Sequence, residues 1–159
     1  MKKNILIIIG VIVAIIFLLI GAIYVFINNY EEKGVIRGYK DKKEYYGEGF
    51  QDYVDYCKYL YDNEFDDKFC NNKLYNKVRK EDIDNIKGYF ENFEGWMETE
   101  DRLDEYDFKQ ESISAGDYIY ISTKEGEPIG ESAYGKYDNY SICFYDIETH
   151  ILYYIHSNM

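Results

Sequence analysis

The residues best suited to chemistry in this sequence are carboxylates, and their densest group lies between positions 62 and 67. The group consists of Asp62, Asn63, Glu64, Asp66 and Asp67. Calcium takes about six to eight oxygen ligands, and an EF-hand loop starting at Asp62 would need glycine at its sixth position and glutamate at its twelfth. Those positions hold Asp67 and Lys73. We therefore interpret the group as a solvated helix end and assign no metal site.

A second acidic cluster lies between positions 98 and 107. Its members are Glu98, Glu100, Asp101, Asp104, Glu105 and Asp107. Two carboxylates with separated pKa values in one cleft can hydrolyse glycosidic bonds. A surface enzyme that acts on cell-wall polymer through paired carboxylates is therefore the alternative to the function preferred below. The sequence does not show which two carboxylates would form the pair.

Histidines and cysteines offer few further ligands. His150 and His156 would share a face of one strand but lie about 20 Å apart along it. Across a hairpin, Cys143 and His150 would supply two of the four ligands that structural zinc needs. An odd count of three cysteines leaves at least one thiol free. Cys57 and Cys70 would form a disulfide only in an oxidising compartment, and we prefer the interpretation that the thiols are buried in the core.

Common catalytic motifs are absent from the sequence. It contains no glycine-rich phosphate loop, no nucleophile elbow and no HExxH pair. We therefore assign no catalytic, cofactor-binding or metal-binding residue, and we expect no cofactor.

One long apolar run, from Ile5 to Ile27, precedes all of these residues and contains no lysine, arginine, aspartate or glutamate. As a helix it would reach roughly 34 Å, enough to cross a hydrocarbon layer of about 30 Å. It is apolar on every face, unlike an amphipathic core helix. We predict a short tail at 1–4 and a single-pass transmembrane signal anchor at 5–27 that contacts the lipid bilayer.

Other interpretations of the run fit the sequence less well. A cleaved secretory signal has an apolar core of about 7 to 15 residues, which is shorter than this run. An apolar N-terminal helix followed by an antiparallel sheet also resembles type IV pilins and pseudopilins, and this resemblance implies a pilin-like or structural surface component. The pilin processing signature includes a glutamate near the start of that helix, and this run has none.

Charge beside the run bears on its orientation. Lys2 and Lys3 directly precede it, whereas Glu31 and Glu32 follow it. Five basic residues between 33 and 43 favour the opposite orientation, but long C-terminal domains are translocated largely regardless of charge. We expect a protein of the cell membrane whose C-terminal domain is extracytoplasmic.

The net charge of −12 excludes some partners, and without Lys2 and Lys3 the rest of the chain carries −14. Nucleic acid is not an expected partner, because its binding depends on Lys and Arg that neutralise phosphates. Such a domain favours cationic partners. With no catalytic motif present, we predict a membrane-anchored, non-catalytic acidic interaction module that binds an unidentified partner, such as a basic protein. The twenty tyrosines accompany abundant Ile, Asn and Lys, a composition that AT-rich codons would produce.

The remaining sequence predicts an α+β fold. We expect a charged, glycine-containing stalk at 28–49 and a soluble domain at 50–159. Apolar residues at helical spacing predict helices over 50–61 and 81–100, with a short third helix near 69–78. Alternating residues predict three antiparallel strands at 117–123, 139–146 and 149–156. Two or three helices would then pack on one face of a C-terminal meander.

Overall fold

The computed structural model describes residues 12–13, 15–22, 32–46, 53–99, 106–123 and 139–158. The chain divides into two compact units, Met1–Lys33 and Gly34–Met159. In the first unit, residues 15–22 are helical and exposed, and most of the predicted anchor lies outside the described residues. Within the described part, no helix combines the length and the apolar character needed to cross a bilayer.

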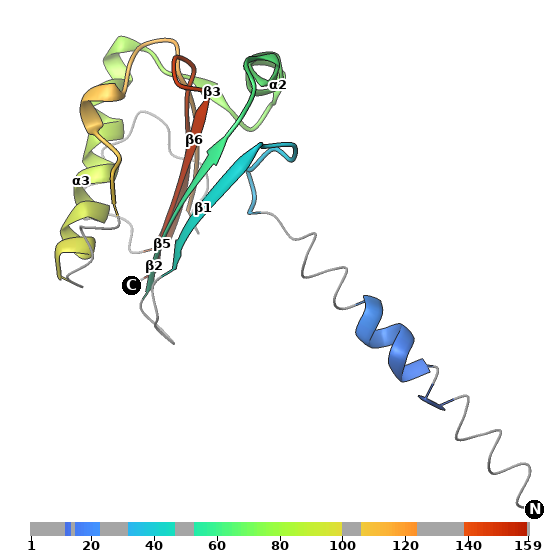
Figure 1. Cartoon of the computed structure of the whole chain (residues 1–159). Helices are drawn as coiled ribbons and strands as arrows, with labels where there is room; N and C mark the ends of the chain where they lie inside the picture. Colours follow the sequence, from blue (N-terminus) through green and yellow to red (C-terminus); the bar gives the residue numbers. More distant parts are fainter. Residues whose placement is uncertain are drawn as a thin grey trace, which may run out of the picture. The chain divides into compact units, whose positions relative to one another are not determined.

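The second unit is built on one antiparallel sheet of six strands, in the order β1-β2-β6-β5-β4-β3 (Figure 1). Its strands are β1 (Asp41–Tyr46), β2 (Tyr53–Leu60), β3 (Asn76–Lys77), β4 (Tyr118–Thr123), β5 (Asn139–Asp146) and β6 (Ile151–Asn158). The predicted meander is confirmed in β4, β5 and β6. The sequence did not predict that β6 also pairs with β2, which puts β6 in the middle of the sheet.

The longest described helix is α3 (Ile83–Thr99), which confirms the prediction over 81–100. A short 3-10 turn, η2 (Lys80–Asp82), leads into it. Its buried side chains Ile86, Phe90, Phe93 and Met97 recur every three or four residues, and Tyr89 beside them is buried as well. α3 lies along one face of the sheet (Figure 1). Its buried side chains pack on that face, where the Phe90 ring lies 6.1 Å from that of Phe144. We call this side the α3 face.

The opposite side of the sheet carries most of the buried tyrosines, and we call it the tyrosine face. Its buried cluster includes Tyr59, Tyr61, Tyr75, Tyr118, Tyr120, Tyr145 and Tyr154. It is covered by the 3-10 turn η1 (Asn63–Phe65), the short helix α2 (Asp66–Asn71) and residues 35–39. The sheet is therefore covered on both sides, and many of the tyrosines belong to the core.

The helix predicted over 50–61 is wrong, because β2 occupies this stretch. Val54 and Tyr56 belong to the core on the α3 face, whereas Cys57 and Tyr59 belong to the tyrosine face. A strand that is buried on both faces carries apolar residues without polar alternation, so its sequence also fits a helical spacing.

The short helix predicted near 69–78 was placed too late in the sequence. The observed helix, α2, starts at Asp66 and ends at Asn71. Its first turn contains Asp66 and Asp67, which complement the positive end of the helix dipole. After it, the side-chain oxygen of Asn72 accepts a hydrogen bond from the Leu74 amide at 3.0 Å, a local turn that competes with further helix.

The segment expected as a stalk, 28–49, differs from that expectation where it is described. Residues 41–46 form the edge strand β1, in continuous register with β2. Val35, Ile36 and Tyr39 pack against the core of the tyrosine face. The compact unit therefore begins at Gly34 and not at residue 50.

Candidate functional site

An open groove of about 480 Å³ beside α3 is a candidate site. It is lined by Glu91, Glu94, Gly95, Glu98, Tyr106 and Phe108. The three glutamates are three and four residues apart, so they lie along one side of the helix. Tyr106 and Phe108 come from the chain that follows α3, and their side chains belong to the core of the α3 face. We call this site the acidic groove.

Glu94 is the most constrained carboxylate of the acidic groove. The Gln110 side-chain amide donates a hydrogen bond to Glu94 Oε2 at 2.6 Å. Burial raises the pKa of Glu94 above its ordinary value, and the nearby charges of Glu91 and Glu111 act in the same direction. The hydrogen bond from Gln110 opposes this increase. Burial together with the Glu94 charge raises the pKa of Tyr106, so its hydroxyl keeps its proton.

This arrangement combines carboxylates with aromatic rings, and both attract cations. Carboxylates form charge-assisted hydrogen bonds with Lys and Arg, and ring faces attract the same groups. The sequence analysis included Glu98 in an acidic cluster but missed Glu91 and Glu94. Their spacing along a helix was visible in the sequence, whereas the approach of Tyr106 and Phe108 depends on the tertiary fold.

The second acidic cluster is only partly described. Glu98 lines the acidic groove, while Glu100, Asp101, Asp104 and Glu105 lie outside the described residues. Asp107 forms an ion pair with Lys58 and accepts a hydrogen bond from the Tyr56 hydroxyl at 2.7 Å. Burial alone would raise the pKa of Asp107, but these two hydrogen bonds lower it below its ordinary value. Asp107 therefore ties the chain after α3 to β2.

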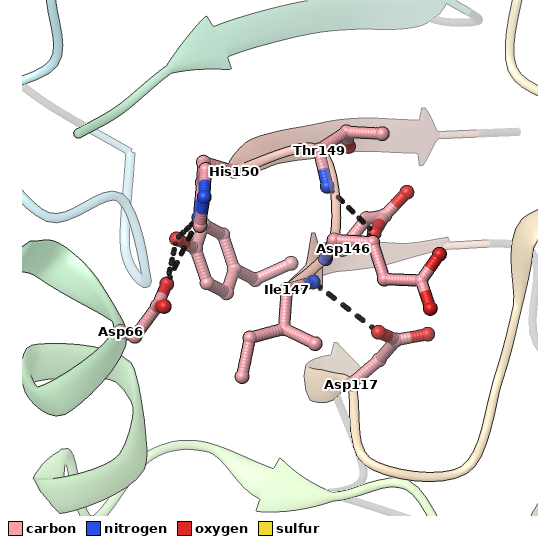
Figure 2. A network of polar contacts seen from close by, with 8 residues as sticks. Asp66, Asp117, Asp146, Ile147, Thr149 and His150 are labelled. Atoms are coloured by element: carbon pink, nitrogen blue, oxygen red, sulfur yellow. Dashed lines mark hydrogen bonds and ion pairs between the residues drawn. The ribbon is translucent and has the colours of Figure 1, made fainter. Parts of the chain in front are cut away.

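The first acidic group lies at η1 and α2, near the N-terminus of a helix, and its members have structural contacts. Asp62 forms an ion pair with Lys40. Asp66 Oδ1 accepts a hydrogen bond from the Tyr145 hydroxyl at 2.6 Å and lies 3.1 Å from His150 Nδ1 (Figure 2). His150 has a φ of 57°, in the left-handed region. These contacts attach α2 to the turn between β5 and β6.

The same turn is held by two buried carboxylates (Figure 2). Asp146 Oδ1 accepts hydrogen bonds from the backbone amides of Glu148 and Thr149, at 2.9 and 3.2 Å. Asp117 Oδ1 accepts one from the Ile147 amide at 3.2 Å. Burial raises the pKa of Asp117, although hydrogen bonds from Ser114 and Ile147 oppose the increase. These carboxylates therefore cap a turn.

The histidines and cysteines do not form a metal centre in the described part of the chain, where no three His, Cys, Asp or Glu side chains are grouped to hold an ion. His156 lies 3.5 Å from Asp55, away from the contact between His150 and Asp66. Cys143 stands opposite Tyr154 in the sheet and not beside His150.

None of the three cysteines is in a disulfide. Cys57 and Cys143 are buried, as the sequence analysis preferred, but Cys70 is exposed. Cys70 forms a hydrogen bond with Tyr118, which is the main reason that the pKa of this tyrosine is raised to about 12.

Comparison with known proteins adds no relative to this picture. No family model matches the chain, and it has no match among curated proteins or solved structures.

Proposed function

We propose that the unit from Gly34 onward is a non-catalytic interaction module that the stretch 5–27 holds at the cell membrane, on its extracytoplasmic side. Its partner is a basic protein, which the acidic groove binds. The groove carries this proposal, because it places three glutamates of α3 beside two aromatic rings. The charge of −14 beyond the anchor supports it further, since such a field attracts cationic proteins.

The partner would engage the groove through Lys or Arg side chains. Glu91 and Glu98 are exposed, so a solvated cation reaches them without displacing the core. Glu94 lies between them and is half-buried. A partner helix or extended segment with two or three basic residues would match this line of carboxylates, and the Tyr106 and Phe108 rings would contact the apolar stems of those side chains.

The proposal is tested with a defined probe and with the native host. The full chain in detergent micelles is titrated with an oligolysine peptide, and a host lysate is passed over the immobilised chain. The double variant Glu91→Gln, Glu98→Gln should weaken peptide binding about tenfold, or about 0.7 kcal/mol for each carboxylate removed. The same variant should lose a stoichiometric partner that the wild-type chain retains.

A matched control separates the groove from net charge. Glu64 and Glu148 are also exposed, but they lie in η1 and in the β5–β6 turn. The double variant Glu64→Gln, Glu148→Gln loses the same charge and should bind the peptide within about twofold of wild type. Equal loss in both double variants would contradict a specific role for the groove.

The raised pKa of Glu94 favours a second candidate function, the surface enzyme acting on cell-wall polymer. A glycosidase needs a carboxylic acid that retains its proton beside a carboxylate that does not. In the acidic groove, Glu94 would be the acid and Glu91 or Glu98 its partner. Purified cell wall incubated with the full chain should then release soluble fragments, and Glu94→Gln should abolish the release. Intact wall after incubation with the wild-type chain would exclude this function.

A further inference from the structure

Residues 34–40 cross the tyrosine face without forming a helix or a strand, and we call them the strap. The strap leads directly into β1. Only residues 28–33 separate it from the stretch predicted to span the membrane. A few side-chain contacts attach the strap to the sheet, whereas continuous backbone hydrogen bonds join the strands to one another.

The first attachment is at Gly34. The buried hydroxyl of Tyr75 donates a hydrogen bond to the Gly34 carbonyl at 2.7 Å. Gly34 has a φ of +104° and lies so close to the sheet that an added Cβ would stand 2.6 Å from Cys143 Sγ and 2.8 Å from the Tyr120 ring. Gly34 therefore covers the thiol of Cys143, which is 0% exposed.

The second attachment is at Ile36 and Gly38. The Tyr61 hydroxyl donates a hydrogen bond to the Ile36 carbonyl at 2.6 Å. Gly38 has a φ of +110°, and an added Cβ would stand 2.6 Å from the Phe65 ring. Past these contacts, the Lys40 amide donates to the Leu60 carbonyl at 2.7 Å, where the pairing with β2 begins.

These contacts are weaker than those of the strands beneath them. Two tyrosine hydroxyls hold two carbonyls of the strap, whereas β5 and β6 are paired over eight residues each. Val35 and Ile36 are only half-buried. Segments with few buried contacts and few backbone hydrogen bonds open before the global structure does.

We propose that the strap is a latch that opens while the sheet stays folded, and that its opening uncovers the Cys143 thiol and the Tyr75 side chain. Because the strap follows the predicted anchor after only six residues, a pull on the anchor reaches the strap before it reaches the sheet. A force on the predicted anchor would thus open the latch and expose a surface that is otherwise buried.

Thiol labelling of the full chain in detergent micelles tests the latch. A maleimide is added, and mass spectrometry reads the labelling of the peptide that contains Cys143. Labelling through strap opening should be much faster than global unfolding allows. Its rate should depend only weakly on urea, because a local opening exposes little surface. The proposal would be overturned if the opening that exposes Cys143 had the same free energy and the same urea dependence as global unfolding.

Two kinds of variant separate the strap from the sheet. Tyr75→Phe and Tyr61→Phe each keep the ring and remove one hydrogen bond to the strap, so each should speed Cys143 labelling roughly fivefold, the effect of about 1 kcal/mol. Ile142 lies in β5 and belongs to the core of the α3 face. Ile142→Val should lower global stability without changing the rate of Cys143 labelling. If Ile142→Val speeds the labelling as much as Tyr75→Phe does, Cys143 is exposed by global unfolding and the latch does not exist.

Discussion

Asp117 is fully buried at the start of β4, and its two oxygens are occupied by backbone and hydroxyl donors. Its Oδ2 accepts hydrogen bonds from the amide and the hydroxyl of Ser114, at 2.7 and 3.1 Å, while Oδ1 accepts the Ile147 amide. The carboxylate thus joins the turn before β4 to the turn after β5. Its value to the fold lies in having two acceptor atoms rather than in its charge.

Asp117→Asn should therefore destabilise the domain although the change is nearly isosteric. An amide has only one acceptor oxygen, and its NH₂ group would face donors. We expect a loss of about 1 to 3 kcal/mol in the free energy of unfolding, measured by urea titration. Asp41→Asn is the control, because exposed Asp41 accepts one hydrogen bond from the Lys42 amide, which an Asn oxygen still accepts. Equal stability of the two variants would contradict this account.

Glu94 predicts a pH dependence of stability. Its pKa in the folded domain is raised above the ordinary value of 4.5, so folding favours its protonated form. This contribution is complete below the ordinary pKa and is lost as the pH rises through the raised pKa. Urea midpoints from about pH 4 to about pH 8 should therefore show Glu94→Gln gaining stability relative to wild type as the pH rises. A constant difference across this range would mean that Glu94 titrates at its ordinary value.

At the scale of elements, α3 contains a glycine that packing does not require. A Cβ added at Gly88 would meet nothing within 4 Å. Gly88→Ala should then stabilise the domain by about 0.5 to 1 kcal/mol, because glycine costs backbone entropy inside a helix. Thermal unfolding followed by circular dichroism measures the gain. Gly34→Ala is the opposite control, since a Cβ there meets Cys143 at 2.6 Å, and it should destabilise.

The elements that the sequence predicted correctly are those whose apolar residues follow one clear period. The buried positions Ile86, Phe90 and Phe93 of α3 recur every three or four residues. The strands β4, β5 and β6 follow one another in the sequence and also lie next to one another in the sheet. β2 was mistaken for a helix because Val54, Cys57 and Tyr61 are also spaced three and four residues apart, as on one side of a helix. Its pairing with β6 joins segments about a hundred residues apart, and local periodicity carries no information on such pairs.

Only part of the acidic groove could be predicted from the sequence. Glu91, Glu94 and Glu98 follow from helical spacing once α3 is accepted, because such residues share one side of a helix. Tyr106 and Phe108 reach the groove because the chain returns along α3, with the Phe108 ring 4.3 Å from that of Phe90. That return depends on tertiary contacts such as the bond from Tyr56 to Asp107, which the sequence does not reveal.

For the whole molecule, the extent of the compact unit leads to a prediction about fragments. A fragment starting at Gly34 should be soluble, monomeric and cooperatively folded. A fragment starting at Asp41 lacks the strap, so it loses the partners of Tyr61 and Tyr75 as well as apolar contacts. We expect its free energy of unfolding to be lower by about 2 kcal/mol or more in urea titrations. Equal stability of the two fragments would show that the strap adds nothing to the fold.

Membrane attachment is a separate prediction for the whole chain. If 5–27 spans the bilayer, the full chain should remain in the membrane pellet after washes with high salt and with alkaline carbonate, because only hydrophobic burial then holds it. The fragment starting at Gly34 should stay in the supernatant under the same conditions. Release of the full chain by carbonate would contradict the anchor.

The central place of β6 also determines when the sheet can form. β1 and β2 are joined to β5 and β4 only through β6, which the ribosome makes after every other strand of the sheet. A nascent chain therefore carries two separate sets of strands, β1-β2 and β3-β4-β5, which cannot join into one sheet until β6 is available. If the unit is exported as proposed, we expect this incomplete sheet to leave the chain competent for passage through a narrow translocation channel. The sheet would then be completed on the far side, once residues 151–158 have emerged.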